Sequence, residues 1–184
     1  LRAPGTALYA IENATITAED TTIEGSNGNG IELRTRSSAS LIRCRIAKSG
    51  GSGVSLGSAD ASLLAGANTV IENNALCGID GRAGAKITVQ GCEIKSNRNA
   101  GIAVTGFGTT VELNSAQIIQ NHLTGISIAD GASIKAAHSQ ISQNREHGLM
   151  ITSNTEGAIL DGCTFEDNGA AGLFLDAPGS PISQ

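Results

Sequence analysis

The sequence predicts an all-β chain folded as a single-stranded, right-handed parallel β-helix of about seven coils. Three observations point to this fold: a repeat of 23–25 residues, apolar residues at every second position within the repeat, and a glycine that opens each copy. A fixed period in this range is typical of stacked coils. The opening glycines, each followed by an apolar residue, any residue and a second apolar residue, are Gly30, Gly53, Gly78, Gly101, Gly125, Gly148 and Gly172.

Two apolar columns in each repeat predict two further strands, and therefore three short parallel sheets. Alternation with a period of two indicates strands, whereas helices need ten or more residues at a period of 3.6. Connections between parallel strands are right-handed, which sets the expected hand of the coil. The first column is expected to contain Ile16, Ala39, Leu64, Ile87, Val111, Ile134 and Ala158. The second contains Ile23, Ile46, Ile71, Ile94, Ile118, Ile141 and Phe165.

A polar column follows the third strand and predicts a ladder of asparagine side chains. Amides one coil apart, at about 4.8 Å, can hydrogen-bond to each other and to the backbone of the turn. We therefore expect a buried, structural role for this column. Its members are Ser26 and Ser49 in the first coils, then Asn74, Asn97, Asn121, Asn144 and Asn168.

A sharp corner is expected between the second and third strands of each coil. Glycine and asparagine recur there, as expected where the backbone φ is positive. The corner positions are Asp20, Arg43, Asn68, Gly91, Ser115, His138 and Gly162.

The 184 residues suit one domain. Residues 1–29 are interpreted as a degenerate first coil, 30–175 as the regular coils and 176–184 as a polar tail. One coil buries little surface alone, so stability depends on its neighbours. Leu1 is not an initiator methionine and no signal peptide is visible, so we expect the chain to be part of a larger protein.

Composition excludes several kinds of partner. The formal net charge of −5 gives nucleic acid no general attraction. No run of about 18 apolar residues is present, so no membrane-spanning helix is predicted.

The four cysteines are predicted to be free thiols. Cys44 and Cys92 share a column two coils apart, about 9.6 Å, which exceeds the roughly 7 Å that a disulfide allows between Cα atoms. Cys163 lies in the same column and Cys77 in another. We expect all four to act as small apolar side chains. Free thiols favour a reducing compartment such as the cytoplasm.

The chain resembles the pectate-lyase-like superfamily of parallel β-helices, and within it the short repeats shared by carbohydrate-binding proteins and sugar hydrolases. The likeness covers nearly the whole chain. It rests on the opening glycine motif and on the Ile-x-x-Asn step at 94–97, 118–121 and 141–144. The resemblance implies the fold and a secreted or periplasmic location. It does not imply one activity, because the same repeat occurs in lyases, epimerases, hydrolases, periplasmic binding proteins and substrate receptors of ubiquitin ligases.

Evidence for catalysis is sparse. Glycoside hydrolases need paired carboxylates on one face, but the outward column of the opening strands has only Asp80 near its centre, with Arg82 nearby. These two are the only candidate catalytic pair, and the resemblance implies calcium only if the chain is a lyase. The Asp-Pro-His motif of epimerases is absent, and the turns are short. Exposed aromatic platforms for sugars are nearly missing: the aromatic residues are Tyr9, Phe107, Phe165 and Phe174. We therefore predict no catalytic residue, cofactor or metal.

Two basic features are candidate binding surfaces. The second coil holds Arg34, Arg36, Arg43, Arg45 and Lys48. Separately, Arg98, His122 and Arg145 each follow a ladder asparagine, and His147 lies two residues further on. Cations stacked one coil apart repel unless an anion or Glu146 relieves them. The column is either a binding stripe or a row of solvated turn residues.

The leading hypothesis is a non-catalytic structural or interaction module that binds a protein or an anionic polysaccharide. One alternative is a lyase or epimerase acting on acidic polysaccharide. Another is a rod that self-associates end to end, because an uncapped β-helix exposes strand edges.

Overall fold

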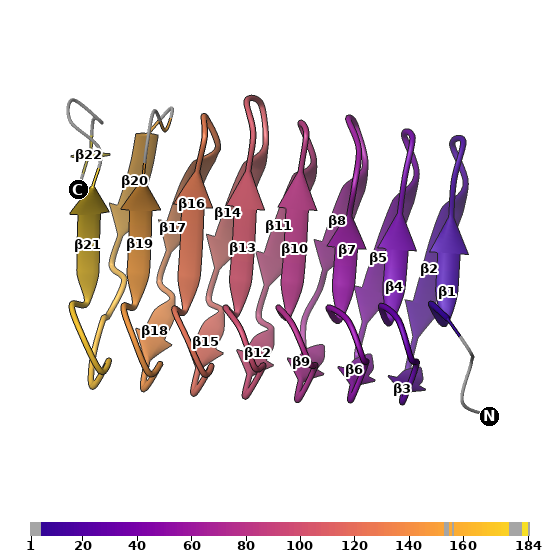
Figure 1. Ribbon diagram of the computed structural model, residues 1–184, viewed down its shortest axis with the longest axis horizontal. Coiled ribbons are helices and arrows are strands. Elements are labelled where there is room, and N and C mark those ends of the chain that lie inside the picture. The colour runs from indigo at the N-terminus through magenta and orange to yellow at the C-terminus, as the bar shows by residue number, and fades with distance from the viewer. Residues whose placement is uncertain (1–4, 153–154, 156, 177–181, 184) are drawn as a thin grey trace.

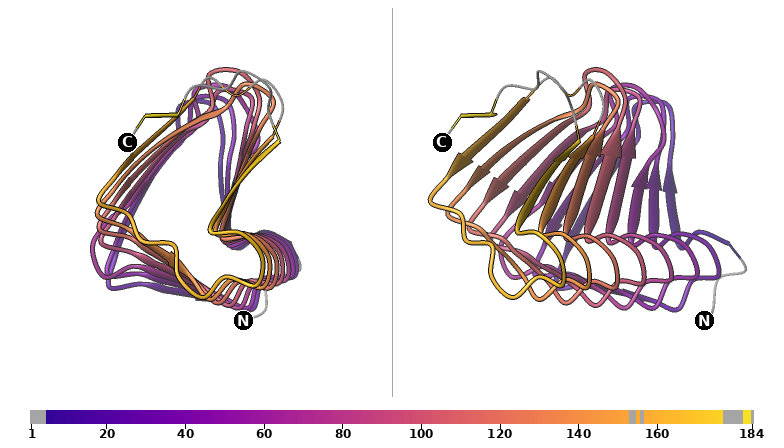
Figure 2. Two further views of the ribbon diagram at one scale, coloured as in Figure 1. Left: turned by 90° about the vertical axis from the view of Figure 1, so that its left-hand side faces the viewer. Right: turned by 60° about the vertical axis from the view of Figure 1, so that its left-hand side comes forward.

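The computed structural model describes residues 5–152, 155, 157–176 and 182–183. The chain is folded as a parallel β-helix (Figure 1). Successive coils nearly superimpose when viewed along the axis (Figure 2). No helix occurs in these described residues. The predicted all-β fold with three parallel sheets is confirmed.

The first six coils each contribute one strand to each of three sheets, called A, B and C here, and the last two coils contribute strands to sheets A and B. Sheet A contains β1 (Leu8–Ala10), β4 (Ile31–Leu33), β7 (Val54–Leu56), β10 (Ile79–Arg82), β13 (Ile102–Thr105), β16 (Ile126–Ala129), β19 (Leu149–Thr152) and β21 (Leu173–Asp176). Sheet B contains β2 (Thr15–Glu19), β5 (Ser38–Ile42), β8 (Ser62–Ala65), β11 (Lys86–Gln90), β14 (Thr110–Asn114), β17 (Ser133–Ala137), β20 (Gly157–Asp161) and β22 (Ile182–Ser183). Sheet C contains β3 (Thr22–Glu24), β6 (Arg45–Ala47), β9 (Val70–Glu72), β12 (Glu93–Lys95), β15 (Gln117–Ile119) and β18 (Gln140–Ser142).

The last strand falls within the predicted polar tail. Ile182 and Ser183 pair in parallel with Ala158 and Ile159 of β20. Residues 177–181 and 184 of the tail lie outside the described part of the chain.

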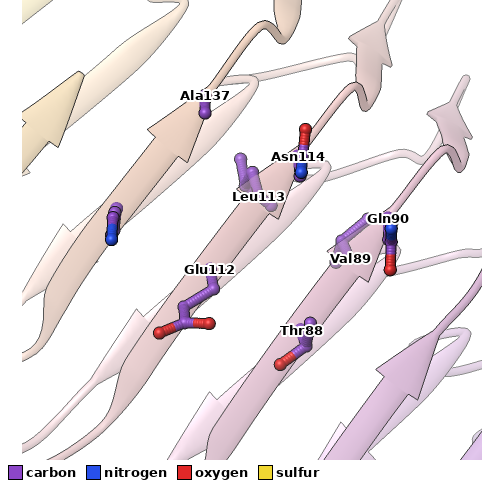
Figure 3. A pocket seen from close by; sticks show the side chains of 8 residues that line it. Thr88, Val89, Gln90, Glu112, Leu113, Asn114 and Ala137 are labelled. Atoms are coloured by element: carbon purple, nitrogen blue, oxygen red, sulfur yellow. The ribbon is translucent and has the colours of Figure 1, made fainter. Parts of the chain in front are cut away.

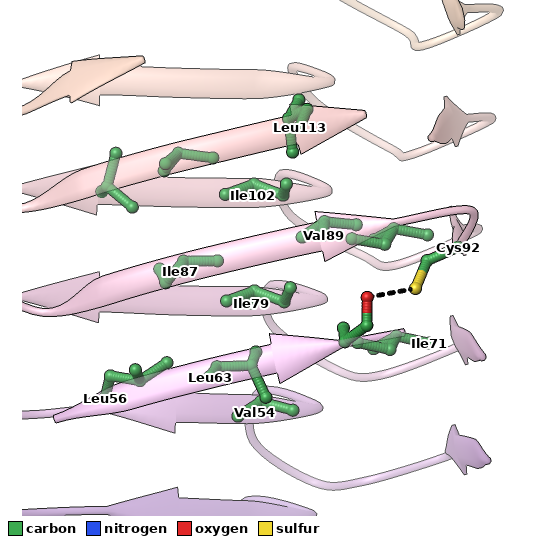
Figure 4. Close-up of a cluster of buried hydrophobic side chains, with 14 of the residues drawn as sticks. Val54, Leu56, Leu63, Ile71, Ile79, Ile87, Val89, Cys92, Ile102 and Leu113 are labelled. Atoms are coloured by element: carbon green, nitrogen blue, oxygen red, sulfur yellow. Dashed lines mark hydrogen bonds between the residues drawn. The ribbon is translucent and has the colours of Figure 1, made fainter. Parts of the chain in front are cut away.

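The core consists of aliphatic columns that run along the axis. The first inward residues of the six strands from β4 to β19 in sheet A are fully buried and face one another in register, as predicted; Figure 4 shows several of them against the side chains of sheet B. They are Ile31, Val54, Ile79, Ile102, Ile126 and Leu149. Because each side chain packs on the same position of the next coil, the repeat itself generates the core.

One position of the predicted register is wrong. Leu63, not Leu64, aligns with Ala39 and Ile87 in sheet B. Leu63 is only 2% exposed, whereas Leu64 points outward and is 39% exposed. The third coil therefore has one of its two additional residues before the strand and the other after it, near Gly66, instead of both before it. Adjacent leucines made the two registers equally apolar in the sequence.

The predicted asparagine ladder is confirmed. Side-chain amides donate to the Oδ1 of the next coil at 2.9–3.1 Å from Asn74 through Asn168. The same Oδ1 atoms accept the backbone N–H of the preceding asparagine. The ladder satisfies backbone and side-chain groups together, which explains why buried polar residues are tolerated beside the core.

The repeat glycine is required by close packing. A Cβ on Gly101 would lie 2.6 Å from a methyl carbon of Ile118, 2.7 Å from the carbonyl oxygen of Gly125 and 2.8 Å from the Asn121 amide. Any larger residue would push the ladder away from sheet A. The opening glycine and the ladder asparagine therefore belong to one packing unit.

Positive φ angles occur at the predicted corner in all seven coils, from 49° at Asp20 and His138 to 62° at Gly91. A second positive column was not predicted. It directly precedes the ladder and contains Gly25, Lys48, Asn73, Ser96, Gln120, Gln143 and Asp167. Of these, Gly25, Asn73 and Asp167 are residue types that signal this conformation.

The four cysteines are free, as predicted. Two of them do more than fill apolar space. The Cys92 sulfur lies 2.9 Å from the carbonyl oxygens of Ala65 and Gly66, and Figure 4 draws one hydrogen bond of Cys92 as a dashed line. Cys44 makes similar contacts with Ala18 and Ile42. These thiols donate to carbonyl groups at the corner between sheets B and C.

Candidate functional site

The outward face of sheet A brings Asp80 and Arg82 together on β10. Arg82 Nη2 lies 3.0 Å from Asp80 Oδ2, and Arg82 Nε lies 3.2 Å from Oδ1. This bond raises the pKa of Arg82. The residues in register with Asp80 on the neighbouring strands are Ser55 and Ala103. Asp80 therefore has one bidentate partner and no second carboxylate beside it.

Glu32 forms a separate ion pair on the same face, two coils away from Asp80. Arg34 Nε lies 2.6 Å from Glu32 Oε1, and the Thr6 hydroxyl donates to Oε2 at 3.1 Å. Burial opposes ionisation of Glu32, but the hydrogen bonds from Arg34 and Thr6 outweigh it and lower its pKa. A carboxylate held ionised in this way is a poor general acid. In the described part of the chain, no group of three or more His, Cys, Asp and Glu side chains could hold a metal ion.

The basic cluster of the second coil is largely neutralised. Arg43 binds Glu19 and Asp20 of the first coil, and its hydrogen bond lowers the pKa of Asp20. The other pairs are Arg45 with Glu24 and Glu72, and Lys48 with Glu24. Because these acids lie one coil away, in the same column as their partner or in a neighbouring one, Arg36 is the one basic residue of this cluster without an ion pair among the described residues.

The second basic feature has no ion pairs of this kind among the described residues. Arg98, His122 and Arg145 are exposed in the turns that lead from sheet C to sheet A. Their backbone N–H groups donate to the carbonyl of the ladder asparagine one coil earlier, at 2.9–3.0 Å. No carboxylate among the described residues lies within 4.0 Å of these side chains. We call these three residues the cationic stripe.

Two residues near the cationic stripe point elsewhere. Glu146 accepts a hydrogen bond from the Thr124 hydroxyl at 3.3 Å and forms no ion pair with the stripe. His147 is half-buried, and its Nδ1 accepts the backbone N–H of Ala171 at 3.2 Å. Its ring stacks on Phe174, with centroids 4.4 Å apart. The structure thus places His147 in a contact with the last coil, and a ligand-binding role for it stays a prediction.

A hollow on the outward face of sheet B, lined by both polar and apolar side chains, was not predicted from the sequence. Its volume is about 370 Å³, and Figure 3 shows its lining. Glu112 lies opposite Lys135 in the register, flanked by Thr88, Gln90 and Asn114. Outward polar residues on a strand give no signal in the sequence that distinguishes a hollow from a flat surface. The hollow contains one acidic and one basic side chain, so it has little preference for an anion.

Together these features define a parallel β-helix with an aliphatic core, carboxylates paired with arginines on sheet A and a cationic stripe that has no ion pairs among the described residues. The chain belongs to the family described as right handed beta helix region, whose model matches residues 2–136 and 30–182. This confirms the right-handed coil and the resemblance inferred from the repeats. No helix of the described residues is long and apolar enough to cross a membrane.

Solved structures with the same fold include the periplasmic alginate epimerase AlgG. A single-substitution form matches with a TM-score of 0.76 and 12% identity, covering 92% of this chain and 45% of that chain. A double-substitution form matches with a TM-score of 0.64 and 14% identity, covering 92% and 49%. The chain thus spans less than half the length of these structures, and identity this low shows the fold alone. No curated protein matches the sequence.

Proposed function

We propose that the chain is a non-catalytic β-helix module that binds an anionic polysaccharide along the cationic stripe. The observation that carries this proposal is the contrast between two basic groups. Four of the five cations of the second coil pair with acids, the exception being Arg36, whereas Arg98 and Arg145 both have no acid partner among the described residues.

The geometry of the stripe suits a polymer that lies parallel to the axis. Three cation-capable side chains project from equivalent turns one coil apart, about 4.8 Å per step. Their mutual repulsion is relieved when anionic groups approach them in sequence. The acids of the other faces do not cancel this local potential beyond a Debye length of about 8 Å. The net charge of −5 therefore does not exclude an anionic ligand.

The surroundings of Asp80 support the non-catalytic part of the proposal. Its two oxygens are occupied by Arg82, and the neighbouring outward residues are Ser55 and Ala103. Acid–base catalysis needs a group that can exchange a proton with the substrate near the working pH. A carboxylate that binds a guanidinium through both of its oxygens does not offer such a group.

The proposal is tested by calorimetric titration with alginate and heparin oligosaccharides at two salt concentrations. We expect wild-type binding that weakens with salt, and a loss of at least about tenfold in the Arg98→Ala/Arg145→Ala variant. The matched control is Lys86→Ala/Lys135→Ala, which removes two exposed cations from sheet B and leaves the stripe intact. Equal affinities of the wild type and the stripe variant would refute the proposal.

Polysaccharide epimerisation is the second candidate function. It is favoured by the solved neighbours, which are named as alginate epimerases and match 92% of this chain. Alginate is itself an anionic polysaccharide, so both candidates share a ligand class. They differ in whether Asp80 and Arg82 contribute chemistry.

A further inference from the structure

Phe107 is the most exposed large apolar residue among those described, at 74% of its surface. It lies in the turn between β13 and β14, between Gly106 and Gly108. Aromatic side chains are strongly favoured in buried positions, and the chain has only three phenylalanines. An aromatic ring this exposed is therefore a candidate contact surface for a ligand.

Phe107 is also an inserted residue. The equivalent turns one coil before and after consist of two left-handed residues, Ala83 with Gly84 and Asp130 with Gly131. In the Phe107 turn the two left-handed residues are Gly106, with φ of 96°, and Gly108, with φ of 73°, and Phe107 stands between them. The turn could close without this residue, as its neighbours do.

The ring is seated on the next coil. A Cβ on Gly131 would lie 2.5 Å from Phe107 Cδ1 and 2.7 Å from both Cε1 and Cγ. Three nearly equal distances to adjacent ring carbons place that point above the face of the ring, not beside its edge. Gly131 is buried beneath the ring. One face of Phe107 therefore rests on Gly131, and the high exposure of the residue leaves the other face open to solvent.

Hydrogen bonds brace the turn on both sides. The buried Thr109 hydroxyl donates to the Thr105 carbonyl at 2.9 Å and accepts the Gly84 N–H at 3.0 Å. The Thr105 hydroxyl donates to Asp130 Oδ2 at 2.9 Å. The ring is therefore presented by a fixed backbone, so a ligand that stacks on it has little ordering entropy to offset.

We propose that Phe107 is the stacking platform of a sugar-binding site that accepts a neutral pyranose residue. The open face of the ring matches the flat C–H face of a pyranose, and Asp130 supplies an acceptor for a sugar hydroxyl. The Asp130 carboxylate also disfavours uronates, which distinguishes this site from the cationic stripe. The two sites lie at opposite ends of the sheet A strands (Figure 1).

A protein partner fits this surface less well. Protein interfaces place several large apolar or aromatic side chains around a central anchor. The neighbours of Phe107 in the adjacent turns are Ala83, Gly84, Asp130 and Gly131. One flat ring surrounded by small and polar residues offers the area of a single sugar unit.

The probes are three neutral oligosaccharides, namely cellohexaose, β-1,4-mannohexaose and β-1,4-galactohexaose. Each is titrated into the protein by NMR, which reports both affinity and the upfield ring-current shift of sugar C–H protons over an aromatic face. We expect at least one probe to bind with such shifts, unaffected by salt. Phe107→Ala should weaken binding about tenfold or more and abolish the shifts.

Two variants make the result specific. Phe107→Tyr keeps the ring and should restore binding, and Tyr9→Ala removes another exposed aromatic, 54% exposed in the first coil, and should bind as wild type. Thermal unfolding checks that each variant is folded. Absence of binding by all three probes, or equal binding by Phe107→Ala, would overturn the proposal. The alginate titration is scored separately, so either site can fail while the other stands.

Discussion

The side-chain amide of Asn121 donates to Oδ1 of Asn144, one coil further along, at 3.0 Å. The same oxygen accepts the backbone N–H of Asn121, also at 3.0 Å, and the amide makes a second bond to the carbonyl of Ile94. Asn121 thereby ties three consecutive coils together, and its own Oδ1 repeats the pattern towards Asn97. The polar ladder holds the turns in the register that the aliphatic columns require.

Replacement of Asn121 tests this coupling. Asn121→Leu removes the amide bonds, leaves the buried backbone N–H of Asn97 without its acceptor, and leaves Asn97 Nδ2 with the Ile71 carbonyl alone. We expect a loss of about 1–3 kcal/mol in the free energy of unfolding, measured in urea. The control Gln117→Leu changes an exposed residue of β15 and should be nearly neutral. If both variants unfold at the same urea concentration as the wild type, the ladder does not stabilise the fold.

Truncation of Ile126 tests the aliphatic column. The residue is fully buried between Ile102 and Leu149 in the register of sheet A. Ile126→Ala should cost about 2–5 kcal/mol, because the stacked coils cannot easily collapse around the cavity. Ser127→Ala, one residue away and outward-facing, is the matched control. A melting temperature unchanged from wild type would show that the column carries little of the stability.

The sequence predicted the architecture well because every coil repeats the same physical problem. The apolar columns and the positive-φ corner occur in seven copies, and the ladder asparagine occurs in five. The fold prediction therefore does not depend on any single copy. The register failed at Leu64, where two adjacent leucines fit either strand phase. Such a choice depends on where the additional residue of one coil is accommodated, and periodicity alone does not specify it.

The candidate sites were less predictable because they depend on contacts between coils. Arg43 and Asp20 share a column, yet a count of basic residues in one coil hid their ion pair. In the sequence, Phe107 stands out only as one of few aromatic residues. Its contact with Gly131 depends on the backbone path of a turn that contains an inserted residue. The local sequence shows which charged and aromatic side chains are present. The contacts between neighbouring coils determine which of these side chains remain free to bind a ligand.

Two buried thiols predict sensitivity to alkaline pH. Burial raises the pKa of both Cys77 and Cys92 from 9.0 to about 11. Between these values the unfolded chain releases thiol protons that the folded chain retains, so the free energy of unfolding falls as the pH rises from about 9 to about 11. Urea unfolding at several pH values measures this slope. The Cys77→Ser/Cys92→Ser variant should show a flatter slope, and an identical slope would exclude these thiols as the cause.

Turnover of acidic polysaccharides separates the two candidate functions. We expect no unsaturated uronate absorbance and no change in uronate composition, by NMR, when alginate, pectate or chondroitin is incubated with the protein, with or without calcium. The reason is the closed Asp80–Arg82 pair on a face without a second carboxylate nearby. Turnover that Asp80→Asn or Arg82→Ala abolishes would establish the enzymatic alternative. Turnover unaffected by both substitutions would exclude this pair as the catalytic centre.

Charge substitution at position 122 tests whether His122 belongs to the cationic stripe. His122→Lys places a permanent cation between Arg98 and Arg145 of the neighbouring coils. A third charge about 5 Å from the ligand is worth about 1 kcal/mol in water, so the affinity for alginate oligosaccharides at constant pH and salt should rise about fivefold. His138→Lys, at the corner between sheets B and C, is the matched control and should bind as the wild type does. If His122→Lys binds no more tightly than His138→Lys, position 122 lies outside the binding surface and the stripe is reduced to its two arginines.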